Sequence, residues 1–179
     1  MEELCLPFEC HTSGYEEDMS IHKNPGKLAK HLALEKAKYI AKKFPNSTII
    51  GADTFITVGS TKIGKPSTYP EAEKIIKSMS GKTIGVHSGI AVIQTGNEGQ
   101  ITKKLVEHVL TKLKIKKMSQ QEIHTLARHD EALQISGAFS IEGEGGKMVE
   151  KIEGDYNNVI GLPIFRLQKM LKKIGFTKA

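Results

Sequence analysis

The sequence predicts a mixed α/β protein in which a β-sheet is flanked by helices. Segments with helical periodicity alternate with segments rich in β-branched residues, short turns join several of the strand-like segments, and no internal repeat interrupts the pattern. Hairpins combined with helices favour a mixed sheet with helices packed against it. Because 179 residues suit one domain, we expect a single domain over residues 1–179.

Start and stop signals place the elements along the chain. A helix is expected from Pro25 to Phe44, where Pro45 and Asn46 end it. The next segment, TIIGADTFITV (48–58), is apolar on both faces and predicts a buried strand. Further along we expect a return strand in TKIGKP (61–66), a helix over 70–79, strands in 85–94 and 104–117, a helix with a Ser119–Glu122 capping box, a short strand near 147–152 and a helix from about Pro163 to Lys173.

Composition bounds the cellular setting. Hydrophobic residues make up 39% of the chain and charged residues 26%, which is ordinary for a globular protein. No apolar run approaches the roughly 18–20 residues needed to cross a bilayer, and the first ten residues do not resemble a signal peptide. We therefore expect a cytoplasmic protein with no membrane partner.

The net charge of +6 is carried almost entirely by lysine, because Arg128 and Arg166 are the only arginines. Lysine serves well as a point charge for phosphate and poorly as a bidentate reader of base edges. The excess of lysine suits a polyphosphate ligand, non-specific nucleic-acid contact or simple solubility. Composition alone favours solubility. Few aromatics and no base-reading motif argue against specific nucleic-acid binding.

Asp53 lies in the middle of the most apolar predicted strand. Aspartate is disfavoured in strands, and an uncompensated buried carboxylate costs several kcal/mol. Such a residue needs strong partners, a position at a strand end in a cleft, or a metal ion. The alternative is a structural aspartate that accepts hydrogen bonds from backbone amides at a turn.

Two lysines, Lys36 and Lys65, could lie near Asp53. At 100° per residue, Lys36 falls near the centre of the apolar face of the first predicted helix, so its ammonium either reaches out to water or points at a buried anion. Lys65, in Gly64-Lys65-Pro66, follows the Asp53 strand closely. A hairpin there would return Lys65 toward the end of the sheet that displays Asp53, although the same tripeptide is also an ordinary turn.

Six segments, taken in order, resemble the Maf family of nucleoside triphosphate pyrophosphatases, which is related to the inosine triphosphatases. The resemblance runs from residue 4 to the C-terminus and implies an elongated mixed sheet flanked by helices, in a single Maf-like domain. The segments are LALEKA (32–37), IIGADT (49–54), IGKP (63–66), MSGKT (79–83), SGAFSIEGEGG (136–146) and GDYNNVIGLP (154–163).

The resemblance implies hydrolysis of a nucleoside triphosphate to the monophosphate and pyrophosphate, with Mg²⁺ or Mn²⁺ as cofactor, in a homodimer. Asp53 matches the family's catalytic aspartate, the general base for the attacking water. Lys36 and Lys65 match its active-site lysines, which would balance the triphosphate charge. Glu17, in the EED run, matches an acidic residue associated with metal binding or catalysis. Carboxylates for water and metal, and cations for the leaving pyrophosphate, suit this reaction.

Two departures from the family pattern affect these expectations. Members begin with a strand and a Ser-x-Ser-Pro-Arg-Arg loop, and EELCLPFE corresponds to the end of the helix that follows, so the resemblance implies that this N-terminal strand and loop are missing here. Thr54 matches the branch that acts on dTTP and UTP. Glu142 stands where that branch carries Gln and where a branch acting on methylated guanosine triphosphate carries Glu, which leaves the base preference open.

The sequence therefore predicts a nucleotide pyrophosphatase with Asp53 as base and with Glu17, Lys36 and Lys65 around the phosphates. The alternative is a Maf-like protein that binds nucleotides or regulates cell division without turnover.

Overall fold

The computed structural model describes Leu4 and residues 6–176. Its strands form one sheet in the order β2-β1-β3-β4-β5, in which β1 pairs antiparallel with β2 and β4 with β5. The predicted mixed α/β fold with flanking helices is confirmed. The elements are α1 (Pro25–Ala41), β1 (Thr48–Val58), β2 (Thr61–Ile63), α2 (Tyr69–Met79), β3 (Thr83–Thr95), β4 (Ile101–Ile115), α3 (Gln120–Ala127), the 3₁₀ helix η2 (Glu144–Met148), β5 (Val149–Glu153), α4 (Tyr156–Val159) and α5 (Ile164–Ile174).

The chain forms two compact units, each built from segments that are distant in the sequence. The first unit contains Met1–Asp53, Ser88–Val109 and Gly161–Ala179, and the second contains Thr54–His87 and Leu110–Ile160. The expectation of a single domain over residues 1–179 stays a prediction. Among the described residues, no helix is both long enough and apolar enough to cross a membrane.

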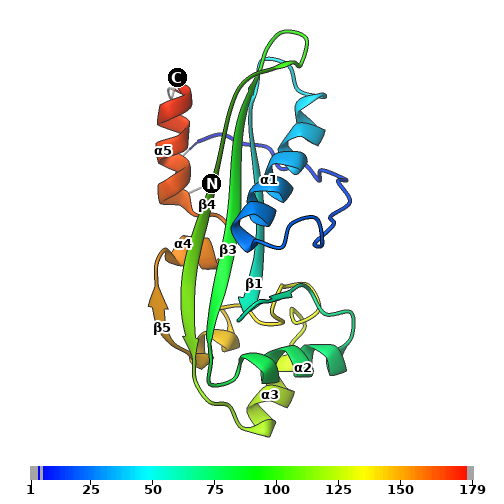
Figure 1. The fold of residues 1–179 in the computed structure, drawn as a ribbon, viewed down its shortest axis with the longest axis vertical. Helices are drawn as coiled ribbons and strands as arrows, with labels where there is room; N and C mark the ends of the chain where they lie inside the picture. The colour runs from blue at the N-terminus through cyan, green and yellow to red at the C-terminus, as the bar shows by residue number, and fades with distance from the viewer. Residues whose placement is uncertain (1–3, 5, 177–179) are drawn as a thin grey trace. The chain divides into compact units, whose positions relative to one another are not determined.

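In the first unit, α1 and α5 lie on opposite sides of the strands (Figure 1). This arrangement follows from the strand period, because successive side chains point to opposite faces. On β1, Ile49 belongs to the apolar cluster with α1, whereas its neighbour Ile50 packs against the cluster formed by α5. The strongly apolar segments of β1 and β3 are thus explained by burial on both faces.

Two glycines allow α1 to lie directly on the strands. A Cβ atom added to Gly51 would collide with the carbonyl oxygen of Ala33, and one added to Gly89 would collide with that of Ala29. Ala29 and Ala33 are fully buried and lie one turn apart on the same face of the helix. Close contact over these turns places the following turn of α1, which carries Lys36, against β1.

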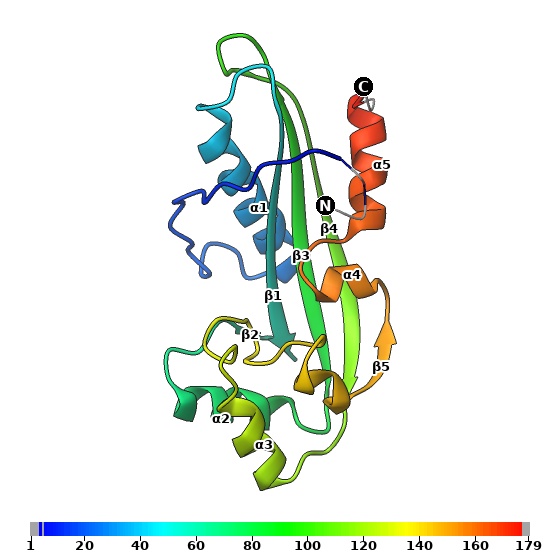
Figure 2. The ribbon, with the colours of Figure 1, turned by 180° about the vertical axis from the view of Figure 1, so that it is seen from behind.

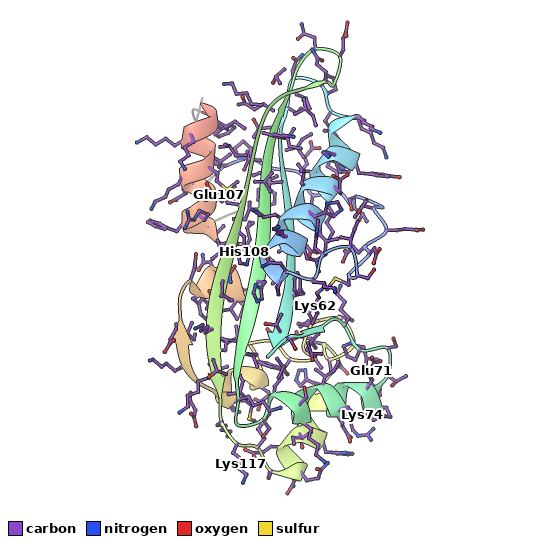
Figure 3. The ribbon with its side chains drawn as sticks, viewed as in Figure 1. Lys62, Glu71, Lys74, Glu107, His108 and Lys117 are labelled. Carbon is purple, nitrogen blue, oxygen red and sulfur yellow. The ribbon has the colours of Figure 1, made fainter. Side chains whose placement is uncertain are left out.

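On β4 too, successive side chains point to opposite faces of the sheet, as Glu107 and His108 show (Figure 3). Glu107 pairs with α5, where Arg166 Nη1 lies 2.9 Å and Lys173 Nζ lies 3.5 Å from its carboxylate oxygens. The next residue, His108, packs against Gly26 at the start of α1. Burial, followed by the charge of Lys30, lowers the pKa of His108.

The second unit has its own core, in which α2 and α3 pack against each other (Figure 2). Its largest fully buried members include Ile76 and Met79 of α2 and Ile84 of β3. At the surface, His124 of α3 lies 2.7 Å from the carboxylate of Glu73 of α2. The helix pair therefore combines an apolar interface with a polar contact at its edge.

The predicted capping box at the start of α3 is confirmed. Ser119 Oγ accepts a hydrogen bond from the Glu122 amide, and Glu122 Oε2 accepts one from the Ser119 amide at 2.7 Å. That amide, together with Lys116 and the Ser119 hydroxyl, lowers the pKa of Glu122 to about 2. The cap fixes the point at which the chain turns from β4 into α3.

The segment GDYNNVIGLP contributes to the structure of the second unit. Asn158 is fully buried, and its Nδ2 donates to the Val86 carbonyl at 3.0 Å and to Thr111 Oγ1 at 3.1 Å. The Asp155 amide also donates to Thr111 Oγ1. These bonds join β3, β4 and α4, so this motif has a structural role whether or not it also contacts a ligand.

Several bounds differ from the sequence predictions: the return strand ends at Ile63 and not at residue 66, β4 covers Ile101–Ile115 and not 104–117, and β5 begins only at Val149. The helix α1 ends at Ala41 and not at Phe44, because the chain turns there and the Phe44 carbonyl accepts a hydrogen bond from Thr95 Oγ1 at 2.6 Å. The short helices η2 and α4 were not predicted, since each spans five residues or fewer and has too few residues for a periodic pattern.

The close approach of α1 to the sheet can be tested with Gly89→Ala. The added methyl group would meet the Ala29 carbonyl, so we expect overpacking to destabilise the protein by about 1–3 kcal/mol. Thermal or urea unfolding measures the change. Gly143→Ala is the matched control, because no atom lies within 4 Å of its Cβ position and its φ is negative, at −108°. Equal stability of the two variants would contradict the packing described for α1.

Candidate active site

Three charged side chains of the first unit meet at the junction of α1 and β1. Lys36 Nζ lies 2.6 Å from Asp53 Oδ1, to which it donates a hydrogen bond, and also 2.6 Å from Glu17 Oε1. The three residues come from an irregular segment, a helix and a strand. One ammonium group therefore joins two carboxylates that are 36 residues apart in the sequence.

Burial differs sharply among these three side chains. The Asp53 side chain is 7% exposed, that of Lys36 is 22% exposed and that of Glu17 is 43% exposed. The lysine thus stands between a buried carboxylate and one that reaches water. Of the two alternatives for Lys36, the structure shows the ammonium pointing at a buried anion, and Asp53 has the charged partner that its burial requires.

The two carboxylates determine the protonation state of Lys36. Burial by itself lowers the pKa of the ammonium, but hydrogen bonds from Lys36 to Asp53 and Glu17 and the negative charges of both residues outweigh burial. The pKa of Lys36 is consequently raised above its ordinary value of 10.5. Lys36 remains a cation at neutral pH, and the cluster carries one net negative charge when both carboxylates are ionised.

Glu17 is positioned by a segment without helix or strand. Residues 6–24 have irregular conformation: the segment crosses the strands from the side of α5 and then runs beside α1 (Figure 1). Asn24 caps the helix, accepting a hydrogen bond from the Lys27 amide at 2.9 Å. Proline at the first helical position then fixes the start of α1. Asp53 and Lys36 are therefore held by regular elements, whereas Glu17 depends on side-chain contacts of this segment.

A large cleft within the first unit adjoins the cluster. Its volume is about 1280 Å³, somewhat above the range of roughly 300–1,000 Å³ for small-molecule sites. Glu17 and Lys36 line it, and Asp53 lies buried next to them. The remaining wall comes from residues 6–15, the end of α1, residues 47–52 and the apolar side chains of Leu162, Leu171 and Phe176. The cleft offers a charged wall and an apolar wall to a ligand.

The other three predicted site residues belong to the second unit and are described within it. Thr54 is half-buried on β1, whereas Lys65 and Glu142 are exposed. Lys65 follows the hairpin of β1 and β2, in which Val58 pairs with Thr61. The prediction that this hairpin returns Lys65 toward Asp53 remains a prediction.

Two of the motifs come together in the second unit. The carbonyl of Gly64, directly before Lys65, accepts a hydrogen bond from the Gly137 amide at 3.2 Å. This bond joins IGKP (63–66) to SGAFSIEGEGG (136–146), the segment that carries Glu142. The exposed Lys65 and Glu142 thus stand on two segments that are held to each other by the backbone.

Sequence reasoning missed the cleft and a set of contacts between residues on either side of Glu17 and α1. Tyr15 Oη lies 3.4 Å from His31 Nε2, and His22 packs edge-on against the same imidazole. No periodic pattern marks Tyr15 or His22, because residues 6–24 are irregular. The available signal was their position, since Tyr15 and His22 flank Glu17 in the sequence and His31 precedes Lys36 on the predicted helix.

The fold and the cluster together define the class of this protein. It is an α/β protein in which a buried aspartate, a lysine and a glutamate meet at the wall of a ligand-sized cleft. Perturbed ionisable groups beside a cleft are typical of functional sites.

Comparison with known proteins shows the family to which the chain belongs. The sequence profile of the family described as "Maf-like protein" matches residues 1–174. A dTTP/UTP pyrophosphatase of Dictyoglomus thermophilum is 36% identical over 162 residues, which cover 90% of this chain and 82% of that protein. A dTTP/UTP pyrophosphatase of Methanosarcina barkeri is 38% identical over 168 residues, covering 94% and 83%. One from Bacillus cereus strain G9842 is 34% identical over 173 residues, covering 97% and 87%. The chain belongs to the Maf family.

The stabilising role of the cluster can be tested with Lys36→Met. Loss of the ammonium removes the cation beside a buried carboxylate, which we expect to cost about 3 kcal/mol at pH 7, the lower end for a buried ion pair because Glu17 is exposed. The raised pKa of Lys36 sets the pH dependence. Its stabilisation is complete below 10.5 and is lost as the pH rises through the folded value, so the difference between wild type and variant shrinks there.

Lys38→Met is the matched control, because Lys38 lies on the same helix 2.7 Å from Glu35 but at the surface. We expect this substitution to cost less than about 1 kcal/mol. Urea unfolding at pH 7 and above pH 10.5 measures both variants. A Lys36→Met penalty no larger than that of Lys38→Met would contradict the role assigned to the cluster.

Proposed function

We propose that this protein is a nucleoside triphosphate pyrophosphatase that hydrolyses a (d)NTP to the (d)NMP and pyrophosphate. The observation that carries the proposal is the pair of carboxylates joined by Lys36 at the wall of the cleft. Membership of the Maf family and the names of the three relatives support it. Hydrolysis of a phosphoanhydride needs a group that accepts a proton from water and cations that stabilise the leaving group, and the cluster contains both.

In the proposed reaction, the oxygen of a water molecule attacks the α-phosphorus. The bond between that phosphorus and the oxygen bridging to the β-phosphorus breaks, and pyrophosphate leaves. Asp53 acts as general base and takes the proton of the attacking water. Its low exposure suits this role, because a carboxylate with few water contacts is held in one orientation by its lysine partner.

The lysines are proposed to bind the triphosphate. Lys36 lines the cleft and stays protonated, so its charge is available to the phosphates as well as to Asp53. Lys65 is exposed and is proposed as a second cation for the polyphosphate. Lysine suits this task because its ammonium group is a compact point charge that can rotate among several oxygens.

A divalent ion, Mg²⁺ or Mn²⁺, is the proposed cofactor, with Asp53 and Glu17 as its protein ligands. The described residues contain no group of three or more His, Cys, Asp or Glu side chains suited to a metal. The two carboxylates nevertheless fit Mg²⁺, which usually binds one or two carboxylates and takes its other ligands from substrate phosphates and water. Both already contact one shared cation, the Lys36 ammonium. A bound ion would polarise the phosphoryl oxygens and neutralise their charge.

The names of the relatives point to dTTP and UTP as substrates, and we propose these two nucleotides for this chain. Thr54 agrees with these substrates, because it matches the residue of the branch that acts on dTTP and UTP. Glu142 is proposed as the position at which base preference is decided, because its carboxylate is exposed and stands where the dTTP/UTP branch carries an amide. A panel that includes methylated guanosine triphosphate distinguishes the two possibilities.

The assembly and location are also proposals. Family resemblance suggests a homodimer, and the composition suggests the cytoplasm. A nucleotide-binding or division-regulating role without turnover is the alternative, and it is distinguished from the enzyme by the test that follows.

Asp53→Asn is expected to lower pyrophosphate release by about 10²–10⁴-fold, because it removes the general base while keeping the size of the side chain. Release is measured over a panel of nucleoside triphosphates with Mg²⁺ or Mn²⁺. Asp130→Asn, on an exposed residue of the second unit, is the control and should leave the rate unchanged. Nucleotide binding by the folded protein without pyrophosphate release would overturn the enzymatic proposal and support the binding protein.

A second prediction follows from the shared cation. Because the Lys36 ammonium offsets part of the negative charge of the two carboxylates that are proposed to hold the metal, Lys36→Met is expected to bind Mn²⁺ several-fold more tightly in the absence of nucleotide, while losing hydrolysis. Calorimetric titration measures the affinity. The double variant Lys36→Met/Asp53→Asn should not show this increase in Mn²⁺ affinity. Unchanged or weaker Mn²⁺ binding by folded Lys36→Met would contradict the assignment of these carboxylates as metal ligands.

A further inference from the structure

Glu17 is the one member of the cluster that no helix or strand holds. It lies in the irregular segment of residues 6–24, its side chain is 43% exposed, and it reaches the cluster through Lys36 at 2.6 Å. A long exposed carboxylate on an irregular segment loses side-chain and backbone entropy when it is fixed in one place. Contacts on either side of Glu17 must therefore limit the range of its positions.

One imidazole provides those contacts. His31, half-buried on α1, lies 3.4 Å from Tyr15 Oη through its Nε2 atom. The ring of His22 packs edge-on against the same imidazole, with centroids 5.3 Å apart and an interplanar angle of 79°. Tyr15 precedes Glu17 by two residues and His22 follows it by five. Residues 15–22 thus form a loop whose two ends meet on His31, and Glu17 lies within it.

Further contacts stiffen the same loop. Asp18 Oδ1 accepts hydrogen bonds from the amide and the hydroxyl of Ser20, at 2.8 and 2.6 Å. Directly before the loop, a Cβ atom added to Gly14, whose φ is +68°, would lie 3.6 Å from the Tyr39 ring, so the chain enters the loop close to α1. A short loop closed at both ends loses less entropy on ordering than an open segment does. Closure of the loop on His31 therefore lowers the entropy that is lost when Glu17 is held beside Lys36.

We propose that His31 is a positioning residue that closes residues 15–22 onto α1 and presents Glu17 to Lys36 and to the metal. This role rests on the proposed function where it concerns the metal, and on the contacts alone where it concerns the loop. His31 contacts Tyr15 and His22 on either side of Glu17, and it is through Glu17 that it acts on the site.

The test compares His31→Ala with His108→Ala, a matched control on a half-buried histidine that packs against α1 at Gly26. Hydrogen exchange of a peptide covering residues 13–22 is expected to speed up several-fold in His31→Ala and to stay unchanged in His108→Ala. Tyr15→Phe, which leaves α1 intact, should produce part of the same effect. Unchanged exchange in both His31→Ala and Tyr15→Phe would overturn the proposal, whether or not the protein hydrolyses nucleotides.

A second readout connects the loop to Glu17. The Mn²⁺ concentration for half-maximal pyrophosphate release is expected to rise about tenfold or more in His31→Ala, as for other residues that orient a metal ligand. Glu17→Gln should show at least this rise, and the double variant should be no worse than Glu17→Gln, because His31 acts through that residue. Additive losses would contradict the role. His31→Gln, whose amide can still bond to Tyr15, should restore part of the affinity. Absence of hydrolysis in the wild type would instead reject the proposed function and leave the exchange result to decide on the loop.

Discussion

The contact between Lys36 and Asp53 is the interaction on which the rest of the site depends. A carboxylate with 7% of its side chain exposed needs a strong partner in an apolar strand, and here that partner is a cation. That cation comes from α1, the helix that covers the strand, and it reaches the carboxylate because α1 lies close to the strands. Gly51 and Gly89, which leave room for the carbonyls of Ala33 and Ala29, allow this closeness. Backbone packing and buried charge are therefore parts of one arrangement.

The same arrangement prepares the cleft for a polyanion. Lys36 satisfies Asp53 on its buried side and faces the cleft with Glu17, so a charged ligand meets groups whose desolvation has already been compensated within the fold. Such preorganised charges act more strongly than the same groups in water, because they need not reorganise when the reaction proceeds. Glu17 differs from the other two residues, since its place depends on the loop that His31 closes.

Most of the fold could be predicted from the sequence because its signals are local. The strand at 48–58 was predicted with its observed bounds, since β-branched residues filled both faces, and the Ser119–Glu122 cap was predicted from its spacing. Asp53 and Lys36 could be singled out because each contradicts the pattern around it. The cleft and the contacts of Tyr15 with His31 could not, since they arise from an irregular segment packing on a helix, and no periodicity encodes such packing.

The product that receives the oxygen atom of the attacking water tests the central claim most directly. Hydrolysis in water enriched in ¹⁸O, followed by mass spectrometry of both products, shows which phosphorus is attacked. Attack at the α-phosphorus, assisted by Asp53, predicts that the label enters the nucleoside monophosphate and that pyrophosphate remains unlabelled. Label in pyrophosphate, or formation of a nucleoside diphosphate and inorganic phosphate, would contradict the proposed reaction.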